Sequence, residues 1–106
     1  MIFDHEGLSR LIDRLRRAGP IGAYPRQALL AYLCAQGAAG RRTPRLLVID
    51  VFDGGGAHGP MCRFSICGDT RAQSFVAPLK HIAVDRKYPA ARALVRLVCD
   101  GAPTAA

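Results

Sequence analysis

Apolar residues recur at helical spacing over residues 4–18, near the start of the chain. The apolar positions are Leu8, Leu11, Ile12 and Leu15, at i, i+3, i+4 and i+7. Such spacing places side chains on one face of an α-helix, and Asp4 is a suitable N-cap. Gly19 and Pro20 end the pattern, because neither residue continues a helix well. The sequence therefore predicts an amphipathic first helix over residues 4–18.

A second helix is predicted between Pro25 and Gly37. Proline suits the first turn of a helix, where its missing N–H needs no partner, and glycine suits the position after the last turn. The residues between them are apolar on almost every side, which predicts burial on more than one side. The preceding segment, AGPIGAYP, contains two prolines and two glycines and is predicted to be a connector.

Two strands are predicted around the glycine-rich segment DGGGAHGP, residues 53–60. Residues 45–52, RLLVIDVF, are mostly apolar and β-branched, and residues 61–67, MCRFSIC, alternate in polarity. If DGGGAHGP is the loop of a hairpin, Phe52 faces Met61 and Asp50 faces Arg63. Opposite charges directly across two strands stabilise such a register.

The same register, continued without irregularity, assigns each side chain to one face of the hairpin. The wholly apolar face then holds Val51, Cys62, Ile49, Phe64, Leu47 and Ile66. The other face holds Phe52, Met61, Asp50, Arg63, Val48, Ser65, Leu46 and Cys67. This second face is too apolar to be left in water. We expect either a helix of the same chain or another chain, such as a second copy in a homodimer, to cover it.

The last third of the chain is predicted to contain a third strand and a final helix. Residues 74–79, SFVAPL, favour a strand, in which Pro78 indicates a sheet edge or the strand end. Residues 80–87 are predicted to be irregular or a short helical turn. Pro89 begins a helix to about Val98 or Cys99, which Gly101 caps. Its apolar face holds Ala91, Leu94, Val95 and Val98.

The predicted order is α-α-β-β-β-α, an α+β fold with a small antiparallel three-stranded sheet packed with helices. The length of 106 residues suits a single globular domain, predicted over residues 1–101, with a C-terminal tail over residues 102–106. The N-terminus carries acids where a secretion signal carries positive charge, and no run of roughly 20 apolar residues follows. We therefore expect a cytoplasmic protein with no membrane partner.

The charge of the chain is its unusual property. Fifteen Lys and Arg against eight Asp and Glu give a formal net charge of +7, which favours nucleic acid or an acidic protein surface as partner. Thirteen of these cations are Arg, and the codon bias of a G/C-rich genome is an alternative source of that excess. The cations form three clusters: Arg10, Arg14 and Arg17; Arg41, Arg42 and Arg45; Arg86, Lys87, Arg92 and Arg96.

Metal, nucleotide and thiol chemistry are all disfavoured by the sequence. Cys62 and Cys67 lie five residues apart on one predicted strand and point to opposite faces, so they cannot share a metal ion. DGGGAHGP connects two strands and lacks the spacing of phosphate-binding loops. Cys62, on the apolar face, is expected to be an inert buried thiol. We therefore predict no catalytic residue, no metal and no cofactor.

Two functions remain open. The first is a non-enzymatic basic protein that binds nucleic acid or a nucleoprotein complex through its arginine clusters, in a regulatory role. The alternative is a protein-binding inhibitor or adaptor of the kind that phages and mobile elements encode, which occludes a target protein. It would use the second sheet face and the hairpin tip, where Gly55, Gly56 and His58 form the contact loop.

Overall fold

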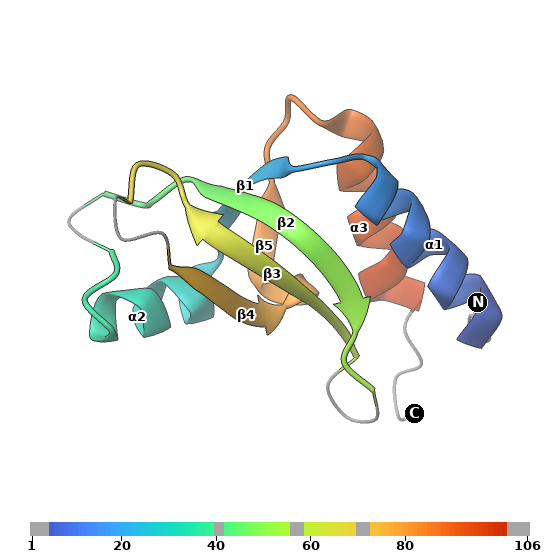
Figure 1. The fold of residues 1–106 in the computed structure, drawn as a ribbon, viewed down its shortest axis with the longest axis horizontal. Helices are drawn as coiled ribbons and strands as arrows, with labels where there is room; N and C mark the ends of the chain where they lie inside the picture. The colour runs from blue at the N-terminus through green and yellow to red at the C-terminus, as the bar shows by residue number, and fades with distance from the viewer. Residues whose placement is uncertain (1–4, 40–41, 56–58, 70–72, 102–106) are drawn as a thin grey trace.

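The computed structural model describes residues 5–39, 42–55, 59–69 and 73–101 (Figure 1). Within them, three helices and five strands follow one another in the order α-β-α-β-β-β-β-α. They are α1 (His5–Arg17), β1 (Ile21–Pro25), α2 (Gln27–Ala35), β2 (Leu46–Asp53), β3 (Pro60–Ile66), β4 (Ser74–Pro78), β5 (Ile82–Val84) and α3 (Pro89–Gly101), with a short 3-10 helix η1 (Leu79–His81) before β5. The α+β class is confirmed, whereas the predicted order and the three-stranded sheet are wrong. The predicted tail, 102–106, lies outside the described residues.

The five strands form one antiparallel sheet in the order β4-β3-β2-β1-β5. The predicted connector AGPIGAYP contains β1, which lies between β2 and β5 and pairs Ile21 with Val48. Pro25 ends this strand instead of beginning a helix. It lies beyond Ala23, the last residue of β1 paired with β2, so its missing N–H removes no bond to that strand.

The predicted hairpin register is correct near the loop and wrong further away. The three pairs next to the loop, as predicted, are Phe52–Met61, Val51–Cys62 and Asp50–Arg63. A β-bulge between Val48 and Asp50 then shifts the register, so that Val48 faces Phe64 instead of Ser65. A shift of one residue exchanges the two faces. Leu46 and Val48 are therefore buried, and Ile49, predicted on the apolar face, is 47% exposed.

One hydrophobic core lies on a single face of the sheet. A row across four neighbouring strands, Val84–Ala23–Leu46–Ile66, is buried throughout. The apolar faces predicted for the first and last helices are confirmed where their side chains are described, because Leu11, Ile12 and Leu15 of α1 and Ala91, Val95 and Val98 of α3 are buried in this core.

The second helix is less buried than its composition predicts. Only Leu29 and Leu33 are buried among the residues of α2, and Tyr32 is exposed. Burial on more than one side is therefore wrong for this helix. Its end is as predicted: Gly37 has a positive φ of 71°, and its N–H donates to the Cys34 carbonyl, a common way to end a helix.

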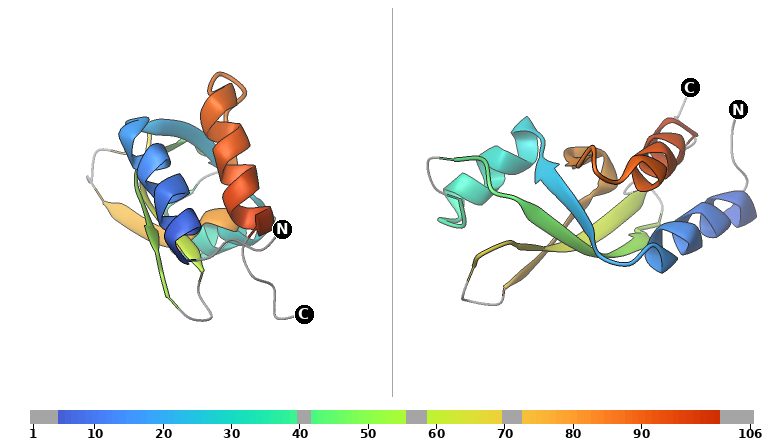
Figure 2. Two further views of the ribbon diagram at one scale, coloured as in Figure 1. Left: turned by 90° about the vertical axis from the view of Figure 1, so that its right-hand side faces the viewer. Right: turned by 90° about the horizontal axis from the view of Figure 1, so that it is seen from above.

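Figures 1 and 2 show α1 and α3 next to each other at one end of the sheet and α2 at the other end. The opposite face of the sheet exposes Tyr24, Ile49 and Val76. No helix in the described part of the chain is long and apolar enough to cross a membrane.

Candidate functional site

The first arginine cluster lies on α1. Arg10, Arg14 and Arg17 are exposed on this helix, as its periodicity predicts. Their neighbour Arg16 forms an ion pair, in which its Nε lies 3.1 Å from Oδ1 of Asp50. Nη2 of Arg63, across the strand pair, lies 3.7 Å from the other oxygen of the same carboxylate. Asp50 therefore joins the end of α1 to the hairpin, and the predicted Asp50–Arg63 pair is confirmed with a third member.

The second cluster is described only for Arg42 and Arg45. Arg41 lies outside the described residues, and Arg42 is exposed in the loop before β2. Arg45 forms an ion pair, in which its Nη2 lies 3.2 Å from Oδ2 of Asp85. The Asp85 side chain is only 12% exposed, and its Oδ1 accepts a hydrogen bond from the backbone N–H of Lys87 at 3.1 Å.

Gly22 in β1 makes room for this ion pair. A Cβ atom at Gly22 would lie 3.0 Å from Nη2 of Arg45 and 3.1 Å from a ring carbon of Tyr88. The Asp85 N–H donates to the Gly22 carbonyl at 2.9 Å, and the Tyr88 N–H donates to the Asp85 carbonyl at 3.0 Å. These contacts hold residues 85–88 against the sheet directly before α3 begins, and so position Arg86.

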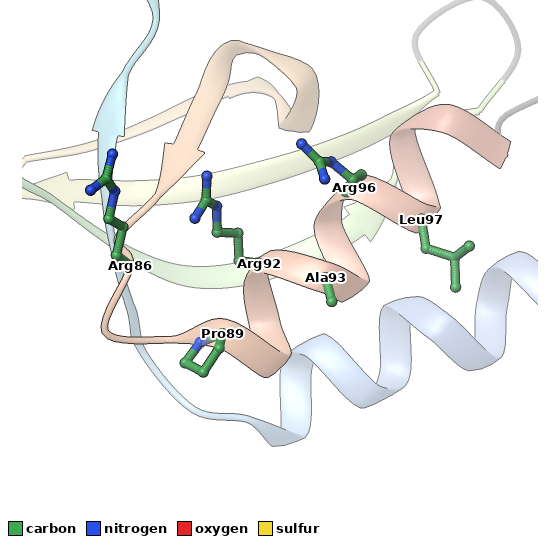
Figure 3. Close-up of a pocket in the computed structure, with 6 residues that line it drawn as sticks. All are labelled: Arg86, Pro89, Arg92, Ala93, Arg96 and Leu97. Carbon is green, nitrogen blue, oxygen red and sulfur yellow. The ribbon is translucent and has the colours of Figure 1, made fainter.

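The third cluster borders a hollow along α3, shown in Figure 3. Its volume is about 510 Å³, and it is lined by Arg86, Pro89, Arg92, Ala93, Arg96 and Leu97. The three guanidinium groups extend to the same side of α3, while Ala93 and Leu97 extend to the other side. Lys87, the fourth predicted member, is exposed and does not line this hollow.

A second hollow of about 360 Å³ shares Arg92 and Arg96 with the first. Arg26 and Lys80 also line it, and its apolar lining includes Leu79 and Val95. Arg26 is fixed there by a hydrogen bond from its Nε to a carbonyl oxygen of β5, that of Ile82, at 3.1 Å. Five cations thus border two adjoining hollows, and no carboxylate is among the described residues that line them.

Sequence reasoning missed Arg26 and Lys80. Arg26 falls in the first turn of the helix predicted between Pro25 and Gly37, and Lys80 falls in the segment predicted to be irregular or a short helical turn. The pairing of β1 with β5 brings them to one place, because Arg26 directly follows β1 and Lys80 lies in η1, directly before β5. No local pattern in the sequence signals that pairing.

The buried position predicted for Cys62 is confirmed, whereas Cys67 lies in the turn after β3 and not on the strand as predicted. Cys62 is fully buried and Cys67 is exposed. Burial, together with the neighbouring Cys99, raises the pKa of the Cys62 thiol to about 12, and a backbone hydrogen bond at Ala77 opposes the shift. Cys62 is therefore a protonated thiol at neutral pH, of low reactivity.

The hairpin tip is described only in part. Gly55 is exposed with a positive φ of 74°, and its N–H donates to the Asp53 carboxylate at 2.9 Å. Gly56 and His58 lie outside the described residues. Among the residues that the structure does describe, no three His, Cys, Asp or Glu side chains gather closely enough to hold a metal ion.

Comparisons with known proteins leave the family open. No protein-family model matches the chain, and no curated protein or solved structure has significant similarity to it. Function is therefore inferred from the geometry of the chain's own residues.

Proposed function

We propose that this protein is a non-enzymatic module that binds nucleic acid, free or within a nucleoprotein complex, along α3 and in a regulatory role. One observation supports the proposal above all: five cations border two adjoining hollows, with no carboxylate among the described lining residues. Guanidinium groups suit phosphate because their planar fork matches two phosphate oxygens.

Arg86, Arg92 and Arg96 differ from Arg16, Arg45 and Arg63, which form ion pairs within the chain. Among the described residues, no ion pair joins Arg86, Arg92 or Arg96 to an acid. Arg92 and Arg96 lie four residues apart on one helix, where like charges disfavour the helix by a few tenths of a kcal/mol. An arrangement that opposes folding in this way is what a surface for an external anion requires.

The test is binding of fluorescent oligonucleotides of about 20 nucleotides, longer than the ~4–16 nucleotides that a single-strand-binding domain covers. The double variant Arg92→Gln/Arg96→Gln should weaken binding about tenfold or more. It should also make the slope of log K against log salt shallower by about 1.5, since two phosphate contacts are lost. Circular dichroism verifies that the variant folds.

The matched control is Arg14→Gln/Arg17→Gln, which removes two exposed charges from α1. This variant should change the affinity by less than about threefold, because only general attraction is reduced. If the two double variants lost affinity equally, binding would depend on net charge alone, and α3 would not be the binding surface. If no probe binds wild-type protein at low salt, the proposal is wrong.

The protein-binding alternative keeps one specific observation in its favour. Tyr24, Ile49 and Val76 are 39%, 47% and 53% exposed on the sheet face that the described helices leave open. Exposed apolar residues that share a face are typical of protein interfaces. This function predicts that partners captured from a native lysate survive nuclease treatment and are lost with Ile49→Asp. A homodimer through the same face would appear as a doubled mass that falls to the monomer in that variant.

A further inference from the structure

We infer that the α3 surface takes a single strand of nucleic acid rather than a duplex, an inference that rests on the proposed function. The phosphates of the strand lie on Arg92 and Arg96, and the nucleosides on either side occupy the two hollows. Three properties of the described residues carry this inference: the shape of the surface, its apolar lining, and the free backbone groups at the border of β5.

The shape suits a flexible strand. Arg92 and Arg96 line both hollows, so these two residues lie at the boundary between two depressions. The volumes, about 510 and 360 Å³, lie within the range of about 300–1,000 Å³ for small-molecule sites. Each hollow thus suits one nucleoside.

A duplex fits this surface poorly. A helix that reads a duplex must protrude so that it enters the major groove, which is about 12 Å wide. Beside α3, however, Lys80 of η1 and Ala83 of β5 line the second hollow together with Arg92 and Arg96. Neighbouring elements therefore flank α3 on that side, and α3 cannot enter the major groove of a duplex.

The apolar lining also favours unstacked bases. Pro89, Ala93 and Leu97 line the first hollow, and Leu97 is 46% exposed. A duplex offers mainly sugar and phosphate to a surface that does not enter its grooves, and these groups gain little from apolar contact. Single strands expose base faces, and contact with these aliphatic side chains removes their apolar surface from water.

Backbone groups of β5 add hydrogen-bonding capacity next to the second hollow. The Asp85 N–H donates to the Gly22 carbonyl, and the Arg26 N–H donates to the His81 carbonyl. Pairs of facing residues in an antiparallel sheet alternate between hydrogen-bonded and non-hydrogen-bonded pairs. The pair Ala23–Val84 follows the hydrogen-bonded pair Gly22–Asp85 and is therefore a non-hydrogen-bonded pair. The N–H and C=O of Val84 consequently point away from β1. Val84 lines the second hollow. One donor and one acceptor there can meet many base edges, which predicts tolerance of sequence.

The experiment compares oligo(dT) with a blunt duplex of the same length, each in competition with one labelled probe at constant salt. Oligo(dT) should bind at least fivefold more tightly. With three to five phosphate contacts, its slope of log K against log salt should lie between about −2 and −3.5. No aromatic side chain is among the described residues that line the hollows, so the affinity should fall steeply with salt.

The variant Leu97→Asn tests the contribution of the bases to binding separately from that of the phosphates. This variant keeps every cation, so it should weaken oligo(dT) binding threefold or more without changing the salt slope or the duplex affinity. Val76→Asn is the matched control, because Val76 is a comparably exposed apolar residue on the open sheet face. It should leave binding unchanged. Circular dichroism verifies both folds.

The outcomes distinguish this inference from the proposed function. If duplex and oligo(dT) bind equally and both depend on Arg92 and Arg96, the preference for single strands is wrong and the nucleic-acid function stands. If Leu97→Asn leaves oligo(dT) binding unchanged, the nucleosides do not occupy the hollows. Failure of both nucleic acids to bind wild-type protein overturns the proposed function itself.

Discussion

At the end of the sheet next to α1, Arg16 and Arg63 share the carboxylate of Asp50, and Arg45 is paired with Asp85 at the start of the segment that leads into α3. Along α3, in contrast, Arg86, Arg92 and Arg96 line a hollow with no carboxylate among its described residues. The two groups are similar in residue type and partial exposure. They differ in whether the chain itself supplies the counter-charge.

If the proposed function holds, this difference means that net charge alone does not locate the binding surface. The paired arginines join segments that are distant in the sequence, and they hold together α1, the hairpin and the segment before α3. The unpaired arginines join nothing, and their mutual repulsion opposes folding. Substitutions in the paired group should therefore lower stability, and substitutions in the unpaired group should lower binding while leaving stability equal or higher.

The largest effect on stability is expected from Asp85→Ala. This change removes the partner of Arg45 and the acceptor of the Lys87 N–H from a side chain that is mostly buried. The free energy of unfolding should fall by about 2 kcal/mol, within the range for a lost charged hydrogen-bond partner. Urea unfolding measures it.

The control for Asp85→Ala is Asp13→Ala. Asp13 is exposed on α1, and no ion pair of this residue is found within the described part of the chain. Its substitution should change the free energy of unfolding by less than about 0.5 kcal/mol. If both variants lost a similar free energy of unfolding, the ion pair with Arg45 would not contribute to stability, and the contrast between paired and unpaired arginines would fail.

The sequence predicts the elements whose pattern is local. Three apolar residues of α1 and three of α3 are buried as their spacing indicates, and the hairpin pairs next to the loop are correct because loop length and the opposite charges of Asp50 and Arg63 both specify them. The bulge at Ile49 could not be predicted, since an unbroken apolar run fits the core in either register.

The missing strands have a different cause. β1 carries Gly22, whose lack of a side chain makes room for Arg45 and Tyr88, and β5 has only three residues. Both are strands because of their long-range pairing, which overrides weak local preference. For the same reason the candidate site is only partly predictable from the sequence. Arg92 and Arg96 could be found from helical spacing, whereas Arg26 and Lys80 join them only through the pairing of β1 with β5.

A smaller loss is expected from Asp50→Asn. The amide oxygen still accepts the hydrogen bond of the Val51 N–H, so the variant removes the charge that Arg16 and Arg63 share and replaces Oδ2, which faces Arg63, with an NH2 group. Both arginine side chains are about half exposed, which limits the loss of unfolding free energy to about 0.5–1 kcal/mol. The difference from wild type should shrink in 0.5 M salt, where exposed ion pairs are screened. A loss that is independent of salt would show that Asp50 acts through packing.

The smallest effect has the opposite sign. Arg92→Gln/Arg96→Gln should raise the free energy of unfolding by about 0.3 kcal/mol, because one repulsive pair four residues apart on α3 is removed. Thermal and urea unfolding at low salt measure the gain, which should disappear in 0.5 M salt as the repulsion is screened. The two single variants complete a double-mutant cycle that isolates the repulsion between the two arginines. A clear loss of stability in the double variant would mean that these arginines stabilise the fold, and the contrast with Arg16, Arg45 and Arg63 would then be lost.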